Sequence, residues 1–136
     1  MSQQCDQAIG RRATKYRKEY ETFRKAAAEE EDWLRAQTST NYDLYDRSDA
    51  IYKKMRDKKK YDQQEVKAWI TLRPEYEKHI LKRPPQSRQD FIPGVTGVKY
   101  EELGIFSNVK DARAEWTKSK SNLSERADYI DERIRK

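Results

Sequence analysis

The sequence predicts an all-α protein, and three observations lead to that prediction. Charged residues make up 40% of the 136 residues, whereas glycine and proline contribute four positions each, a balance typical of solvated helices. Apolar residues recur at spacings of three and four, the period of a helix face, and no stretch alternates with the period of a strand. We expect an elongated antiparallel helical hairpin (about 4–36 and 41–72), a short helix (74–82), an irregular loop (84–98) and a C-terminal helix (107–134).

The first predicted helix carries the clearest pattern, a heptad seam. The seam positions follow one another at spacings of four and three, and they are Ile9, Ala13, Tyr16, Tyr20, Phe23, Ala27, Glu30 and Leu34. Alanine and tyrosine occupy places where a strong zipper has leucine or isoleucine, so this helix needs neighbours. The polar stretch 37–41 is predicted to be a turn, after which Thr40 caps a second helix that folds back on the first.

Capping residues and prolines divide the second half of the chain. Asp62 with Glu65 three residues later resembles a capping box, which leaves open whether a helix restarts there or continues through it. Pro74 is predicted to end that helix and to open the short one. A loop with two glycines follows, and a three-or-four spacing then returns in the last helix at Val109, Ala112, Trp116, Leu123, Ala127, Ile130 and Ile134.

Length and composition favour a single helical domain, 1–136, with a thin core. Leucine, isoleucine, valine and phenylalanine make only about 15% of the chain, a composition that disordered proteins share, although nine tyrosines and three tryptophans add contact area. The single cysteine excludes an internal disulfide, and no apolar run approaches the length of a bilayer span. The N-terminal residues lack the apolar core of a signal peptide. We therefore expect an intracellular, cytoplasmic protein, or a virion component, with no membrane partner.

Candidate catalytic and metal-binding residues are few. His79 is the single histidine and is expected at the surface or rim, while Cys5 is remote from it in sequence, so a Cys-His pair is not expected. Asp43, Asp46 and Asp49 recur every third residue, a spacing that rotates them away from one face of a helix. The expectation is a protein that is not an enzyme and that has no catalytic residue, metal site or cofactor.

Charge is segregated along the chain. Residues 11–25 hold seven basic side chains against two glutamates, and residues 53–60 hold six against one aspartate. A reversal near residue 39 would place the two runs side by side, and their repulsion would favour a polyanionic partner such as DNA or RNA. Changing the lysines at 58–60 to glutamate is expected to leave the helices intact. The residues predicted to bind nucleic acid or another polyanion are Arg11, Arg12, Lys15, Lys18, Lys53, Lys54, Arg56, Lys58, Lys59 and Lys60.

These patterns lead to two classes of function, and no motif is specific enough to indicate a family. The first is a non-enzymatic helical interaction protein, a structural, assembly or adaptor component of a larger complex, with virus-encoded accessory proteins as one setting. Its partner is another protein or a copy of itself. The alternative is a nucleic-acid-binding protein that recognises backbone or shape, or an inhibitor of a nucleic-acid enzyme. The predicted interaction seam consists of Tyr16, Tyr20, Phe23, Tyr45, Tyr52, Trp116 and Leu123.

Overall fold

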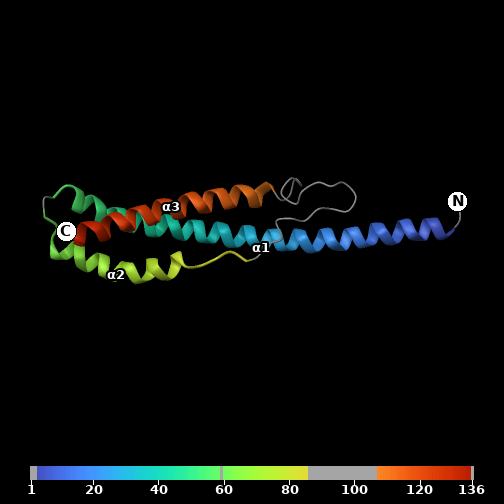
Figure 1. The fold of residues 1–136 in the computed structure, drawn as a ribbon, viewed down its shortest axis with the longest axis horizontal. Helices are drawn as coiled ribbons and strands as arrows, with labels where there is room; N and C mark the ends of the chain where they lie inside the picture. Colours follow the sequence, from blue (N-terminus) through green and yellow to red (C-terminus); the bar gives the residue numbers. More distant parts are fainter. Residues whose placement is uncertain (1–2, 59, 86–106, 136) are drawn as a thin grey trace. The chain divides into compact units, whose positions relative to one another are not determined.

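The computed structural model describes residues 3–58, 60–85 and 107–135, with side chains in the first helix described at positions 17 and 18 and from 20 onward. The described ranges contain three helices, α1 (Gln3–Arg56), α2 (Gln63–Ile80) and α3 (Ser107–Arg135), as Figure 1 shows. The described residues contain no strand, and the all-α prediction is confirmed. Most of the loop predicted at 84–98 lies outside the described residues.

The chain divides into two units, and both draw on α1 and α3. The first comprises Met1–Trp33 with Pro85–Ala112, and its described buried residues are Ala27, Glu30, Val109 and Ala112. The second comprises Leu34–Pro84 with Arg113–Lys136. The single domain remains a prediction.

The second unit is a three-helix bundle in which α1 and α3 run parallel and α2 runs antiparallel to both (Figure 1). Hydrogen bonds between α1 and α3 advance along both helices together, from Asn41 with Ser119 to Met55 with Arg133. The Tyr61 hydroxyl, just before α2, donates to the carbonyl of position 134, and Trp69 Nε1 donates to Asp131. The end of α3 therefore lies beside the start of α2, and the two helices run in opposite directions.

The core of this bundle lies where the apolar seams of the three helices meet. Burying these side chains removes apolar area from water, which is the main favourable term in folding. Tyrosines and isoleucines pack around the buried cluster and widen it. The buried members are Leu44, Ile51, Met55, Trp69, Leu72, Leu123, Ala127 and Ile130.

The turn predicted at 37–41 is wrong, because α1 continues through this stretch to Arg56. Thr38 and Asn41 are buried on the seam side of the helix, so the seam does not stop at residue 34. The Thr40 hydroxyl donates to the carbonyl of Ala36 at 3.2 Å, one turn back, and caps nothing. The chain reverses instead between the end of α1 at Arg56 and the start of α2 at Gln63, and these two helices are antiparallel.

The capping box at Asp62 does begin a new helix, α2. The backbone N–H of Asp62 donates to Glu65 Oε2 at 2.5 Å, which satisfies one of the free N–H groups at the helix start. The break predicted at Pro74 is wrong, because α2 runs through Pro74 to Ile80. Pro74 lies on the exposed face, where water can hydrate the carbonyl that its missing N–H leaves free, and buried Leu72 and His79 continue the inner face on both sides of it.

Candidate functional site

A buried polar layer crosses the second unit, and each of the three helices contributes one side chain to it. Asn41 of α1, His79 of α2 and Ser119 of α3 are 1%, 7% and 4% exposed. Asn41 Nδ2 donates to Ser119 Oγ at 2.9 Å, and Ser119 Oγ donates to the Trp116 carbonyl at 3.0 Å. His79 Nε2 hydrogen-bonds to Asn41 Oδ1.

The donors and acceptors of this polar layer can be assigned from their number. The Ser119 hydroxyl has a single hydrogen, which it gives to a carbonyl, so Asn41 must donate to Ser119 through its NH2 group. The amide oxygen of Asn41 then faces the imidazole and can only accept. His79 therefore donates from Nε2, and its proton is on that nitrogen when the ring is neutral.

The other ring nitrogen of His79 differs in its hydrogen bonding. Nδ1 is buried, and no group among the described residues hydrogen-bonds to it. Burial lowers the pKa of His79, and the positive charges of Lys82 and Lys120 lower it further. The expectation that His79 is a surface or rim residue is wrong, because His79 is buried. Leu72, position 76 and His79 follow one another at spacings of four and three residues, which places them on the inner face of α2.

A second feature is a cluster of tyrosines around Arg126, in the groove between α1 and α3. The Arg126 guanidinium lies 3.7 Å from the Tyr52 ring centre and 5.5 Å from that of Tyr45, to whose hydroxyl it donates at 3.1 Å. Asp49 pairs with the same guanidinium at 3.4 Å. Tyr129 meets Tyr52 edge to face at 4.8 Å between ring centres.

These rings line a surface depression of about 450 Å³ together with Asn122 and Glu125. The Arg126 guanidinium already lies over the rings of Tyr45 and Tyr52, so a cation from the protein itself occupies the ring faces in this depression. Both tyrosines belong to the predicted seam, and they pack against the buried core. The cluster therefore joins α1 to α3.

Lys58, which was predicted to bind a polyanion, lies between α1 and α2 and contacts two carboxylates at the start of α2. Its Nζ is 2.7 Å from Asp62 and 2.7 Å from Glu65, the second of which is only 3% exposed. The hydrogen bond from Lys58, followed by that from the Asp62 backbone, lowers the pKa of Glu65. Arg133 of α3 donates to the carbonyls of Met55 and Lys58, at 3.2 and 2.5 Å, and thereby holds the connection to α3.

Two other basic residues of the 53–60 run also have acidic neighbours. Lys53 pairs with Asp49 at 3.2 Å, one turn earlier on α1. Arg56 pairs with the adjacent Asp57 at 2.9 Å, and this contact raises the pKa of Arg56 and lowers that of Asp57. Their charges are therefore partly balanced within the chain.

The remaining predicted polyanion-binding residues are not gathered into one site by the fold. Lys54 and Lys60 are exposed in the second unit, and Lys18 is exposed in the first. The turn that was to bring the two basic runs together is absent from α1, so that juxtaposition is wrong. Outside the described side chains lie Arg11, Arg12, Lys15 and Lys59.

The other seam residues differ in their burial. Tyr20 and Phe23 are half-buried in the first unit, and Tyr16 lies outside the described side chains. Leu123 is fully buried in the core of the second unit. Trp116 is half-buried, with the Lys120 ammonium 4.8 Å from its ring centre.

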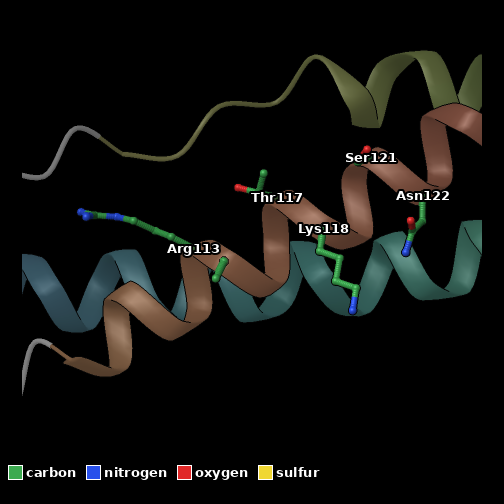
Figure 2. A pocket seen from close by; sticks show the side chains of 6 residues that line it. Arg113, Thr117, Lys118, Ser121 and Asn122 are labelled. Carbon is green, nitrogen blue, oxygen red and sulfur yellow. The ribbon is translucent and has the colours of Figure 1, made fainter.

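One depression on α3 was not foreseen. It has a volume of about 580 Å³ and is lined from one helix face, where Figure 2 shows Thr117 and Ser121 on one side and Lys118 and Asn122 on the other. It is open to solvent and offers hydroxyl and amide groups. Within the described part of the chain, no three histidine, cysteine or carboxylate side chains lie together as a metal site requires.

These features define the second unit as a three-helix bundle that is crossed by a buried polar layer. No protein-family model matches the chain, and comparisons with curated proteins and with solved structures found no match. None of the helices described here has an apolar stretch long enough to cross a membrane.

Proposed function

We propose that this chain is a non-enzymatic helical interaction protein, a structural, assembly or adaptor component of a larger complex. The observation that carries the proposal is the length of the α1 seam compared with the helices that pack on it. α1 has 54 residues, whereas α2 has 18 and α3 has 29. At 1.5 Å per residue these lengths correspond to about 81, 27 and 44 Å of helix.

The seam keeps one register from Ala27 to Met55, which favours helix-to-helix association along it. Ala27, Leu34, Asn41, Ser48 and Met55 are buried at intervals of seven residues. The same interval leads back in the sequence to positions 20 and 13, where the side chains are tyrosine and alanine. Among the described helices, α2 and α3 are both much shorter than α1. We propose that a helix from another chain packs along the N-terminal part of the seam.

The unusual polar groups of the second unit support a binding role. The His79 Nε2–H is used to join three helices, and Glu65 is used to begin α2 and to hold Lys58. Groups that are engaged in this way stabilise a fixed bundle. A bundle held by such contacts, in which α1 is one of the helices, is a suitable scaffold for assembly.

The proposal is tested by sedimentation equilibrium of the full chain over a wide range of concentration. We expect concentration-dependent association, weakened by Phe23→Ala on the half-buried seam. Thr22→Ala, at an exposed neighbouring position, is the matched control and should have no effect. A chain that stays monomeric at every concentration, or that associates equally well with either substitution, would contradict a role for this seam in self-association.

The nucleic-acid alternative, including inhibition of a nucleic-acid enzyme, has lost its main argument. It rested on two basic runs lying side by side, and Lys58 of the second run is engaged by Asp62 and Glu65. Exposed Lys54 and Lys60 are what remains in its favour.

A further inference from the structure

The polar layer of Asn41, His79 and Ser119 has a direction, because the donor of each hydrogen bond in it can be assigned. His79 donates to Asn41, Asn41 donates to Ser119, and Ser119 donates to the carbonyl of Trp116. This series of hydrogen bonds is complete when the imidazole is neutral and carries its proton on Nε2. A second proton has to go to Nδ1, which is buried and has no acceptor among the described residues.

We propose that this layer is a pH-sensitive latch, which holds the C-terminal end of α2 against α1 and α3 and releases it when His79 takes up a second proton. Protonation creates a buried N–H donor without a partner and a buried positive charge at the same time. Both are costly, since an unsatisfied buried donor loses its hydrogen bonds to water and a buried cation loses its hydration.

The groups that face His79 from each element oppose its protonation. α1 contributes the neutral amide of Asn41, and α3 contributes the Ser119 hydroxyl and the ammonium of Lys120. The segment after α2 contributes Lys82, whose charge also acts on the imidazole. These groups include two positive charges, so they do not stabilise an imidazolium.

The position of His79 makes the release local. It lies in the last turn of α2, near the end of the helix. The opposite end is held by Trp69, whose Nε1 donates to Asp131 at 2.7 Å, and by Glu65 with its partner Lys58. Beside the layer, the end of α2 is held by Ile80 against the core and by Glu75 with Arg47. Losing the layer therefore weakens the hold on the end of α2 while its first half keeps its own contacts.

The pH window follows from the direction of the pKa shift. The pKa of His79 is lower in the folded chain than its ordinary value of 6.5, so the unfolded chain binds the proton more readily. The stabilising contribution is complete above pH 6.5 and is lost as the pH falls from there through the lower folded value. Glu65, whose pKa is also lowered, loses its contribution only below its ordinary value of 4.5.

Because His79 is the only histidine in the chain, its titration can be read without overlap. We expect nitrogen NMR of the full chain to show a neutral imidazole with its proton on Nε2, titrating below 6.5. Urea unfolding should show an equilibrium constant for unfolding that rises by up to about tenfold per pH unit across this window. Hydrogen exchange at about pH 5.5 should show that amides near residues 76–80 lose protection before those near Trp69.

Two variants separate the latch from a structural role of the same side chain. His79→Gln should remove the pH dependence in this window, even if it lowers stability at every pH. Asn41→Asp should raise the pKa of His79, because it places a carboxylate against the imidazole. An imidazole that titrates at or above 6.5 in the folded wild type, an equal pH slope in the wild type and H79Q, or a uniform loss of protection would each overturn the proposal.

Discussion

Lys58 and Lys60 are neighbours of the same type, yet they have different surroundings. Lys58 neutralises Glu65, a carboxylate that is almost entirely buried beside the start of α2. Lys60 is exposed. Burying a carboxylate without its partner is unfavourable, because the charge loses its hydration. A substitution at Lys58 therefore affects stability more than one at Lys60, although the two residues are of the same type.

We expect Lys58→Glu to lower the free energy of unfolding, because it places a second negative charge against Glu65 and Asp62. Lys60→Glu is the matched control and should leave the free energy of unfolding nearly unchanged. Urea denaturation of both variants at neutral pH measures the difference. Equal midpoints would show that the contact between Lys58 and Glu65 contributes nothing. The sequence led us to expect that reversing all three lysines of 58–60 leaves the helices intact, and the contact of Lys58 with Glu65 makes Lys58 the position where we now expect a loss of stability.

At the scale of elements, the seam of α1 explains why one helix forms where a turn was predicted. Asn41 and Ser48 are polar but occupy seam positions seven residues apart, where both are buried. A cluster of threonine, serine and asparagine usually indicates a loop, since these side chains compete for backbone hydrogen bonds. Here Asn41 bonds to groups on α2 and α3 instead, and tertiary contacts outweigh the local preference.

A proline substitution at position 39 tests whether residues 37–41 form a continuous helix or a turn. Ser39 is exposed and lies inside α1, so Ser39→Pro should remove a helical hydrogen bond and clash with the preceding turn, at a cost of about 3 kcal/mol or more. Ser39→Ala is the control and should be neutral or slightly stabilising. Thermal unfolding followed by circular dichroism provides the comparison. A turn would accept the proline with little change, and that result would contradict a continuous α1.

At the scale of the whole molecule, the question is whether the basic run at residues 53–60 carries enough unbalanced positive charge to bind a polyanion. Lys53 and Arg56 have acidic neighbours at 3.2 and 2.9 Å, which reduces the positive field that a phosphate backbone would meet. The proposed interaction with another helix depends on the α1 seam instead. The two kinds of partner differ in how their binding responds to salt.

The nucleic-acid alternative predicts a steep salt dependence. Each phosphate neutralised contributes about −0.9 to the slope of log K against log salt for duplex DNA. If the basic run binds phosphates, changing Lys53, Lys54 and Lys60 to glutamate should nearly abolish DNA and RNA binding, while Lys58 stays in place to keep α2 anchored. We expect little or no binding by the wild type in a fluorescence-anisotropy titration at about 50 mM salt. Tight, salt-sensitive binding that the triple substitution removes would favour the alternative over the helical scaffold.

Much of the helical architecture was readable from the sequence, because it depends on local periodicity. The spacing of Val109, Trp116 and Leu123 predicted the last helix over 107–134, and α3 spans Ser107–Arg135. The pairing of Asp62 with Glu65 resembled a capping box but left open whether a helix starts there, and the structure shows that α2 does. Capping and periodicity act within a few residues, so a single segment contains the information.

The sequence by itself determined that this protein is helical, where α1 and α3 begin, and that few apolar residues are available for a core. Only the tertiary structure decided that α1 continues through residues 37–41, that α2 passes Pro74, and that His79 is buried. The physical reason is the same in each case. Asn41, His79 and Ser119 are polar residues whose place in a core depends on partners from other helices, and positions 38 and 78 residues apart become neighbours only when the bundle forms.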